Sequence, residues 1–290
     1  MQTLRDLDRR YAEEGVHPHQ RALRAARDIL GDSFSMGVGG NPEVERITSA
    51  YGGMLPEGNA NWPGMGIGLA AVVDQVRRVT MPVVFGTVAI EIWRGLGFSS
   101  DREWWAWCRE DRDLAARTAF AFADLTDLTY GLDDLRHANG AGLELWRMAT
   151  SNISDVANTL PGTFSVDTVL QPICLSAELS LKAAIVQAGG DPEGFRRRGG
   201  EGHDLTRLAE RLAHDRPHRD DARIAQIVAA MPPYVDSRYA PAGLTRLQVV
   251  RLALGAQLIA AATVRRYSSR DMAGGFDQGG WPAPRPDILS

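Results

Sequence analysis

A charged pair stands inside an apolar stretch of this sequence. Residues 175–185 read LSAELSLKAAI, and Lys182 is the only lysine among the 290 residues. Glu178 precedes Lys182 by four residues, which places both side chains on one helix face in the order that favours their attraction. Charges in an apolar helix need partners, because their desolvation is costly. The sequence therefore predicts a buried ion pair with further polar neighbours. Downstream candidates for these neighbours are His203, Asp204, Arg238 and Tyr239.

Two roles are open for this pair. It can order the packing of the helices, since a buried ion pair contributes specificity more reliably than stability. It can also form the polar floor of a pocket for a nucleotide or another small molecule.

Arginines and a histidine follow this helix. The loop EGFRRRGGEGH places Arg196, Arg197 and Arg198 beside glycines. Forked guanidinium donors and free backbone N–H groups in such a loop can hold a phosphate. His203 closes the loop, and a histidine near its ordinary pKa can contact a phosphate or transfer a proton. The structural alternatives are a solvated charged loop and a helix-capping role for Asp204.

Acidic residues in FADLTDLTYGLDDLRH raise the question of a metal site. Asp124 and Asp127 are three residues apart and share a helix face. Di-metal helical bundles use Glu-x-x-His pairs, which this segment lacks. Cys108 and Cys174 are far apart and have no metal-ligand spacing. We therefore expect no metal site, no disulfide framework and no cofactor.

Three tryptophans crowd into DREWWAWCRED, at positions 104, 105 and 107. Successive side chains on a helix differ in direction by roughly 100°, so the three rings cannot all face one core. We expect at least one ring to meet another subunit, another domain or a ligand. The structural alternative is a packed junction between the two halves of the chain.

Helical periodicity covers most of the chain, and no convincing strand alternation is present. Residues 1–30 have a helical pattern that Pro18 interrupts, and residues 31–68 are rich in Gly, Pro and Asn. A helical pattern resumes at Leu69 and continues to about Trp146. The sequence predicts further helices over 141–158, 169–188, 204–214, 220–239 and 244–267.

The predicted fold is therefore all-α, with three regions. Residues 1–140 form a helical region that contains the irregular Gly/Pro-rich segment 31–68. Residues 141–270 form an antiparallel helical bundle. Residues 271–290 form a Gly/Pro-rich tail that we expect to be loosely held.

Composition limits the classes of function. The net charge is −4, with 44% hydrophobic and 23% charged residues, which is typical of a globular protein and excludes a polycation that coats nucleic acid. The apolar stretch from Met81 to Trp93 is too short to span a bilayer and contains Glu91. The amino-terminal segment lacks the apolar core of a signal peptide. These features predict a cytoplasmic protein without membrane contact, and the preference for Arg over Lys suggests a GC-rich bacterial genome.

Three motifs follow one another in the second half of the chain. AELSLKAAI carries Glu-x-x-x-Lys, GHDLTRLAERL carries Gly-His-Asp-Leu, and YVDSRYAP carries Arg-Tyr before a final long helix. This order, over roughly residues 143–267, resembles the HEPN domain. HEPN domains are antiparallel helical bundles, widespread in prokaryotes, that often act as dimers. The resemblance implies this fold for residues 141–270 and a homodimeric assembly.

Many HEPN domains accompany nucleotidyltransferases, toxin–antitoxin pairs and defence systems. The resemblance therefore implies that this chain binds a nucleotide, an RNA end or a partner protein in a bacterial defence or regulatory system. The binding residues would then be Glu178, Lys182, Arg196, Arg197, Asp204, Arg238 and Tyr239.

An enzyme is the alternative. Ribonucleases of the HEPN family carry an arginine and a histidine separated by four to six residues near the start of a late helix. After Arg238 the sequence runs YAPAGLTRLQ without a histidine, whereas Arg198 and His203 fit the spacing in RGGEGH. A metal-independent ribonuclease would use Arg198 to hold the phosphate and His203 as acid–base catalyst. A small-molecule enzyme with a pocket between the two helical halves and a purely structural interaction module are the other hypotheses.

Overall fold

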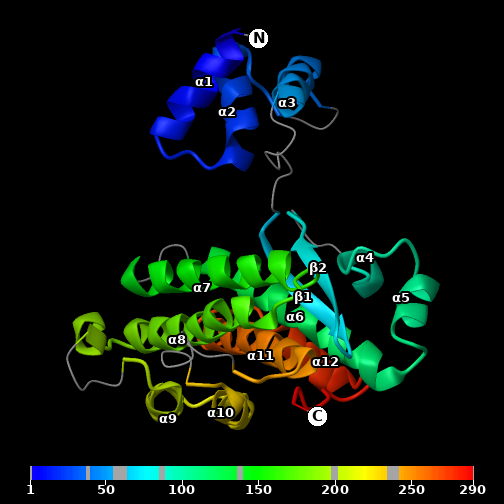
Figure 1. Cartoon of the computed structure of the whole chain (residues 1–290), viewed down its shortest axis with the longest axis vertical. Helices are drawn as coiled ribbons and strands as arrows, with labels where there is room; N and C mark the ends of the chain where they lie inside the picture. The colour runs from blue at the N-terminus through cyan, green and yellow to red at the C-terminus, as the bar shows by residue number, and fades with distance from the viewer. Residues whose placement is uncertain are drawn as a thin grey trace. The chain divides into compact units, whose positions relative to one another are not determined.

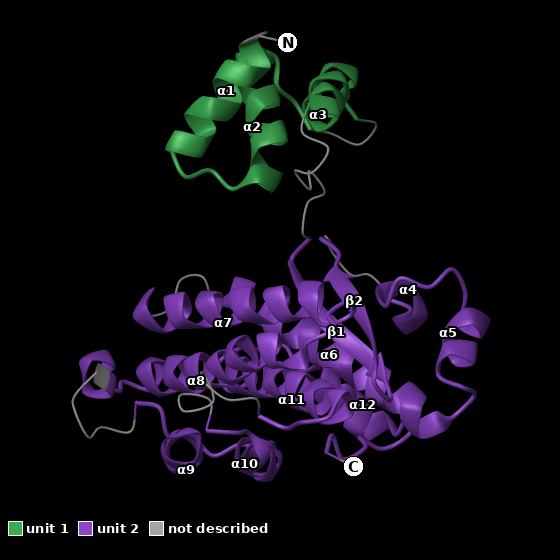
Figure 2. Cartoon of the chain, viewed as in Figure 1, with its two compact units in different colours: residues 1–63 green, residues 64–290 purple. Residues whose placement is uncertain are grey.

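Helices make up most of the chain in the computed structural model (Figure 1). The structure describes residues 2–36, 40–54, 64–84, 89–135, 140–196, 202–233 and 242–289. The only sheet within these ranges has two strands. The all-α prediction is thus confirmed in its main feature. The chain divides into two compact units, residues 1–63 and 64–290 (Figure 2). The boundary predicted near residue 140 falls inside the second unit.

Unit 1 consists of three helices around a small core. They are α1 (Gln2–Glu13), α2 (Pro18–Leu30) and α3 (Pro42–Met54), with the short 3₁₀ turn η1 (Gly31–Ser33) after α2. Pro18 begins α2, at a position where its missing N–H costs nothing. Buried Tyr11 and Tyr51 anchor the core, and the Tyr11 hydroxyl donates to Asp28 at 2.8 Å. The irregular segment predicted over 31–68 therefore contains a full helix, α3.

A β-hairpin replaces the helix that we predicted from Leu69 onward, so that prediction is wrong. Strands β1 (Gly66–Val72) and β2 (Gln75–Met81) pair antiparallel, with Val72 opposite Gln75. Helices α6 (Arg112–Asp134), α7 (Gly140–Thr159) and α11 (Arg246–Arg265) contact β1, and every position of that strand after the first is buried. A strand buried on both faces shows no alternation of polar and apolar residues. The turn that connects the strands places Val73 at a positive φ of 57°, where glycine or asparagine is usual. The sequence therefore lacks the usual signal of a hairpin turn.

Four long helices form the centre of unit 2 (Figure 1). They are α6 (Arg112–Asp134), α7 (Gly140–Thr159), α8 (Leu170–Gln187) and α11 (Arg246–Arg265). Helix α8 contacts both α7 and α11, and α11 also contacts α6. The segments Val166–Gln187 and Arg246–Arg265 are long and apolar enough to cross a membrane, but 83% of an apolar 18-residue stretch within each is buried in the protein. Their apolar character is accounted for by their place in the core.

Shorter helices surround this centre. They are α4 (Ile92–Gly95), α5 (Asp101–Trp107), α9 (Leu205–Asp215), α10 (Asp221–Ala230) and α12 (Met272–Gly279), with 3₁₀ turns η2 (Val166–Val169) and η3 (Pro192–Arg196). Ser100 caps α5 as predicted, accepting from the Glu103 N–H at 3.2 Å. Helix α12 and the residues after it pack on the core, so the tail predicted to be loosely held is fixed to the fold.

The tryptophans of α5 pack within unit 2. Trp104 is fully buried, and its indole N–H donates to the Thr118 hydroxyl at 2.9 Å. Its ring lies 6.0 Å from Trp281 of the tail, centroid to centroid. Trp105 and Trp107 are partly buried against the same core. These contacts favour the structural alternative, a packed junction, although the junction joins α5 to the core and tail rather than two halves of the chain.

Candidate functional site

The predicted ion pair of α8 is present and has a third member. The Lys182 ammonium lies 2.6 Å from Oε1 of Glu178, one helical turn away. The other carboxylate oxygen, Oε2, lies 3.2 Å from Nδ1 of His203, in the segment before α9. One buried carboxylate thus holds two nitrogen-bearing side chains from two segments of the chain. We call Glu178, Lys182 and His203 the α8 cluster.

The members of the α8 cluster differ in their access to solvent. Glu178 is buried, the Lys182 side chain is 11% exposed, and the His203 side chain is 69% exposed. The Lys182 nitrogen also lies 5.5 Å from the centre of the Phe195 ring of η3, close enough for a cation–π contact. The carboxylate and the ammonium are therefore shielded from solvent. The imidazole is the part of the cluster that a ligand can contact.

Helix α9 begins at Leu205, with Asp204 between the helix and His203. Asp204 caps it, accepting from the backbone N–H of Arg207 at 3.1 Å, as the structural alternative proposed. The first N–H groups of a helix have no partner within the helix and carry partial positive charge. Arg207 and Arg211 lie on the same helix, 3.3 Å from Asp204 and 3.5 Å from Asp215, so carboxylates offset their charges. The positive end of the helix is therefore what would favour an anionic ligand beside His203.

The structure places some of the predicted site residues and not others. It brings together Glu178, Lys182, His203 and Asp204. Arg196 is the last residue of η3. Four predicted binding or catalytic residues lie outside the described residues: Arg197, Arg198, Arg238 and Tyr239.

A second group of buried charges, which the sequence analysis did not identify, surrounds Arg265 at the end of α11. Its Nε donates to Asp127 at 2.7 Å, its Nη1 lies 3.3 Å from Asp220, and its Nη2 donates to Asp124. The second oxygen of Asp124 accepts from Arg285 of the tail. These five side chains, here called the Arg265 network, tie α6, α10, α11 and the tail together.

Burial and ion pairing have opposite effects on two carboxylates of the Arg265 network. Burial raises the pKa of Asp127, although Arg265 and the backbone N–H groups of Met272 and Ala273 oppose this shift. Burial also opposes ionisation of Asp220, but Arg265, Arg285 and other nearby cations outweigh it, so the pKa of Asp220 is lowered. The same carboxylates raise the pKa of Arg265 against the effect of its burial. The ion pairs of this network connect α6, α10 and the tail to the end of α11.

Neither acids nor thiols offer another reactive centre in the described ranges. Asp124 and Asp127, which we considered as metal ligands, accept from arginines instead. No group of three or more metal-ligating side chains gathers among the described residues. Cys108 and Cys174 are fully buried, and burial raises their pKa values to about 11 and about 12. Both thiols therefore remain protonated and shielded near neutral pH, unsuited to nucleophilic attack.

Comparisons of the chain with protein-family models, with curated proteins and with solved structures find no match.

Proposed function

We propose that the α8 cluster binds the phosphate of a nucleotide or of an RNA end, in a HEPN-like protein of a bacterial defence or regulatory system. The observation that carries this proposal is the double use of Glu178, whose carboxylate positions both Lys182 and His203. His203 lies just before α9, and Arg196, Arg197 and Arg198 precede it in the loop EGFRRRGGEGH. Because the net charge of the chain is −4, binding of a polyanion requires such a local concentration of cationic groups.

The geometry defines a role for each group in this proposal. When Nδ1–H of His203 donates to Glu178, the ring is held in one orientation and Nε2 is left to meet the ligand. Nε2 then contacts a phosphate oxygen of the ligand. Glu178 balances the charge of Lys182 and orients the His203 ring. The exposed arginines of α9 attract the polyanion from solution.

Binding is tested with a mononucleotide and with a 5′-phosphorylated RNA oligonucleotide, by calorimetry and by thermal shift on the full chain. His203→Ala should weaken binding about tenfold or more, since a hydrogen bond to a charged group is lost. His214→Ala is the matched control, because His214 is exposed in the last turn of the same helix. Equal affinities for wild type and His203→Ala would refute the assignment.

A ribonuclease is the second candidate, and the contact between Glu178 and His203 favours it. A carboxylate that orients an imidazole through Nδ1 leaves Nε2 as an acid–base group, the arrangement used in many hydrolytic sites. RNA cleavage in the presence of a chelator should be lost in His203→Ala and retained in His214→Ala. If the wild type binds RNA but does not cleave it, the ribonuclease hypothesis is refuted and the binding function remains.

We also propose that the protein is cytoplasmic and acts as a homodimer, as the resemblance to HEPN domains implies. Light scattering after size-exclusion chromatography should give twice the mass of the 31.6 kDa chain. A mass of one chain at micromolar concentration would remove the dimer from the proposal.

A further inference from the structure

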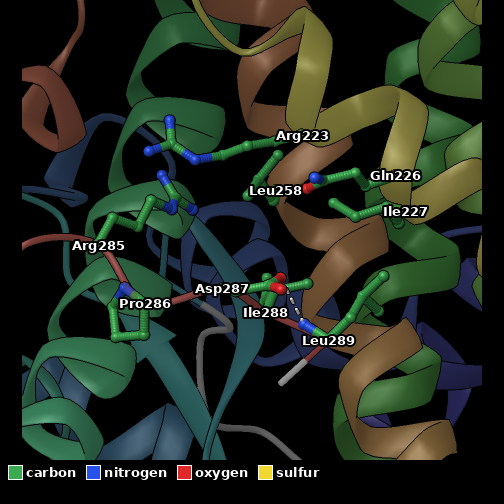
Figure 3. A pocket seen from close by; sticks show the side chains of 9 residues that line it. All are labelled: Arg223, Gln226, Ile227, Leu258, Arg285, Pro286, Asp287, Ile288 and Leu289. Carbon is green, nitrogen blue, oxygen red and sulfur yellow. Dashed lines mark hydrogen bonds between the residues drawn. The ribbon is translucent and has the colours of Figure 1, made fainter.

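A cavity of about 220 Å³ lies between α10, α11 and the tail (Figure 3). Its polar lining comes from Arg223 and Gln226 of α10 and from Arg285 and Asp287 of the tail. Ile227 and Leu258 are among its apolar lining residues. This volume lies below that of a drug-sized pocket and therefore suits a small ligand.

One nitrogen of Arg285, at the charged end of this cavity, has no hydrogen-bond partner among the described residues. Arg285 has a side chain only 4% exposed; its Nη2 donates to Asp124, while its Nη1 is buried and has no hydrogen-bond partner among the described residues. Buried charged donors are almost always paired, because the desolvation of an unpaired one is costly. This nitrogen is not exposed to solvent, so a slight shift of the cavity lining would let an acceptor supplied by a ligand satisfy it.

A second guanidinium group faces the first. Arg223 and Arg285 point toward one another across one end of the cavity in Figure 3. Arg223 is bound on one side, where its Nη1 lies 3.2 Å from Asp220. Two cations that face each other repel, and an oxyanion between them relieves this repulsion and accepts from both. The forked geometry of guanidinium groups suits the planar or tetrahedral oxygens of carboxylate and phosphate alike.

The apolar and amide side chains of the lining indicate what the ligand carries besides its oxyanion. Ile227 and Leu258 offer an apolar wall, and the Gln226 amide offers one donor group and one acceptor. We propose that this cavity binds a small organic oxyanion, a carboxylate or phosphate with a short apolar part, through Arg223 and Arg285. This site is separate from the α8 cluster and does not depend on the function proposed for it.

The test measures oxyanion binding to the full-length protein at constant ionic strength, balanced with sodium chloride. Inorganic phosphate and butyrate are the two probes, since they share the charge and differ in the apolar part. Saturable binding by calorimetry, with a rise of the melting temperature, is expected for butyrate at lower concentration than for phosphate, because only butyrate reaches the apolar wall. The phosphate arm is measured on His203→Ala, so that the α8 cluster does not contribute. Stronger binding of phosphate than of butyrate by that variant would identify the ligand as a phosphate compound and would refute the apolar part of the proposal.

Two variants decide whether the binding occurs in this cavity. Arg223→Gln should weaken binding about tenfold or more, and it should fold, because the Arg223 side chain is already 37% exposed. Arg285→Lys keeps a cation for Asp124 but removes the forked donor, and it should weaken binding likewise. Arg147→Gln is the matched control, because Arg147 likewise pairs with a carboxylate three residues away, Glu144, on the exposed side of α7. His203→Ala should bind butyrate as the wild type does, which separates this site from the α8 cluster.

Amide hydrogen exchange supplies a readout that does not depend on affinity alone. Butyrate should slow exchange in residues 285–289, because the ligand would hold the tail segment that lines the cavity. Absence of saturable binding for both probes, or equal binding by wild type and Arg223→Gln, would overturn the proposal.

Discussion

Removal of the Arg265 guanidinium tests whether the buried ion network stabilises unit 2. Arg265→Met keeps most of the side-chain volume and deletes one fully buried cation. Asp124 would retain Arg285, and Asp127 would retain two backbone N–H donors, but both would lose their strongest partner. Removing one partner from a buried ion pair costs about 3–5 kcal/mol of unfolding free energy.

This cost should be visible in thermal and chemical unfolding. For a domain of the size of unit 2, about 2–4 °C of melting temperature corresponds to 1 kcal/mol, so a decrease of roughly 6–20 °C is expected. Urea unfolding, followed by circular dichroism, should give the same loss of free energy with an unchanged m-value. Arg270→Met is the matched control, because it breaks an exposed ion pair with Asp134 and should cost at most about 1 kcal/mol.

The pH dependence of Arg265→Met provides a second criterion. Without the cation, the buried carboxylates would have higher pKa values, and protonation would relieve the unpaired charge as the pH falls. The difference in stability between wild type and variant should therefore be smaller at pH 5 than at pH 7. A loss below about 1 kcal/mol at pH 7, or a loss that grows at pH 5, would refute the account of the network.

Three further predictions concern single sites. Gln257→Leu should destabilise the fold by about 3 kcal/mol or more in urea unfolding, because the amide of Gln257 makes three buried hydrogen bonds to the backbone of β1 and α6. Burial lowers the pKa of His218, so the unfolded chain binds a proton first as the pH falls below about 6.5; stability should fall from pH 7 to pH 5, and His218→Gln should flatten this slope. Iodoacetamide should modify neither Cys108 nor Cys174 in the folded protein and both in urea, because burial keeps the two thiols protonated and inaccessible.

Each of these predictions has an outcome that contradicts it. A Gln257→Leu variant as stable as the wild type would mean that the backbone groups find other partners. An identical pH slope in wild type and His218→Gln would assign the acid sensitivity to other groups. Rapid modification of either cysteine without denaturant, measured by mass spectrometry, would show that the region around that thiol opens readily.

The sequence predicted the α8 cluster because its information is local. Glu178 and Lys182 are one helical turn apart, so periodicity alone places them together, and their apolar surroundings show that they are buried. The contact of His203 with Glu178 spans 25 residues, and His203 was one of four downstream residues that we considered as partners of the pair. No such argument applies to the roles of these residues, which depend on what the cluster binds.

The Arg265 network and the hairpin were beyond this kind of inference. Arg265 meets Asp124 across 141 residues, and Arg285 meets the same carboxylate across 161 residues. No periodicity connects positions so far apart. The hairpin escaped prediction because helices cover both faces of β1, which removes the alternation that identifies a strand. Strand β1 also contains Gly68, where a Cβ would lie 2.7 Å from a methyl carbon of Leu125. Close packing on α6 thus favours glycine at a position where strand-forming residues would have indicated a strand.

Asp124 connects the stability of the fold to the cavity under the tail. Its two oxygens are divided between Arg265, which lies in the core, and Arg285, which lines the cavity. An oxyanion that accepts from Nη1 of Arg285 leaves the bond from Nη2 to Asp124 intact, so the ligand adds a partner and displaces none. The tail therefore stays attached to the core by the ion network whether or not a ligand is bound. Because Arg285 is already held in place, little side-chain freedom remains to be lost on binding, and this preorganisation favours affinity for a ligand of few atoms.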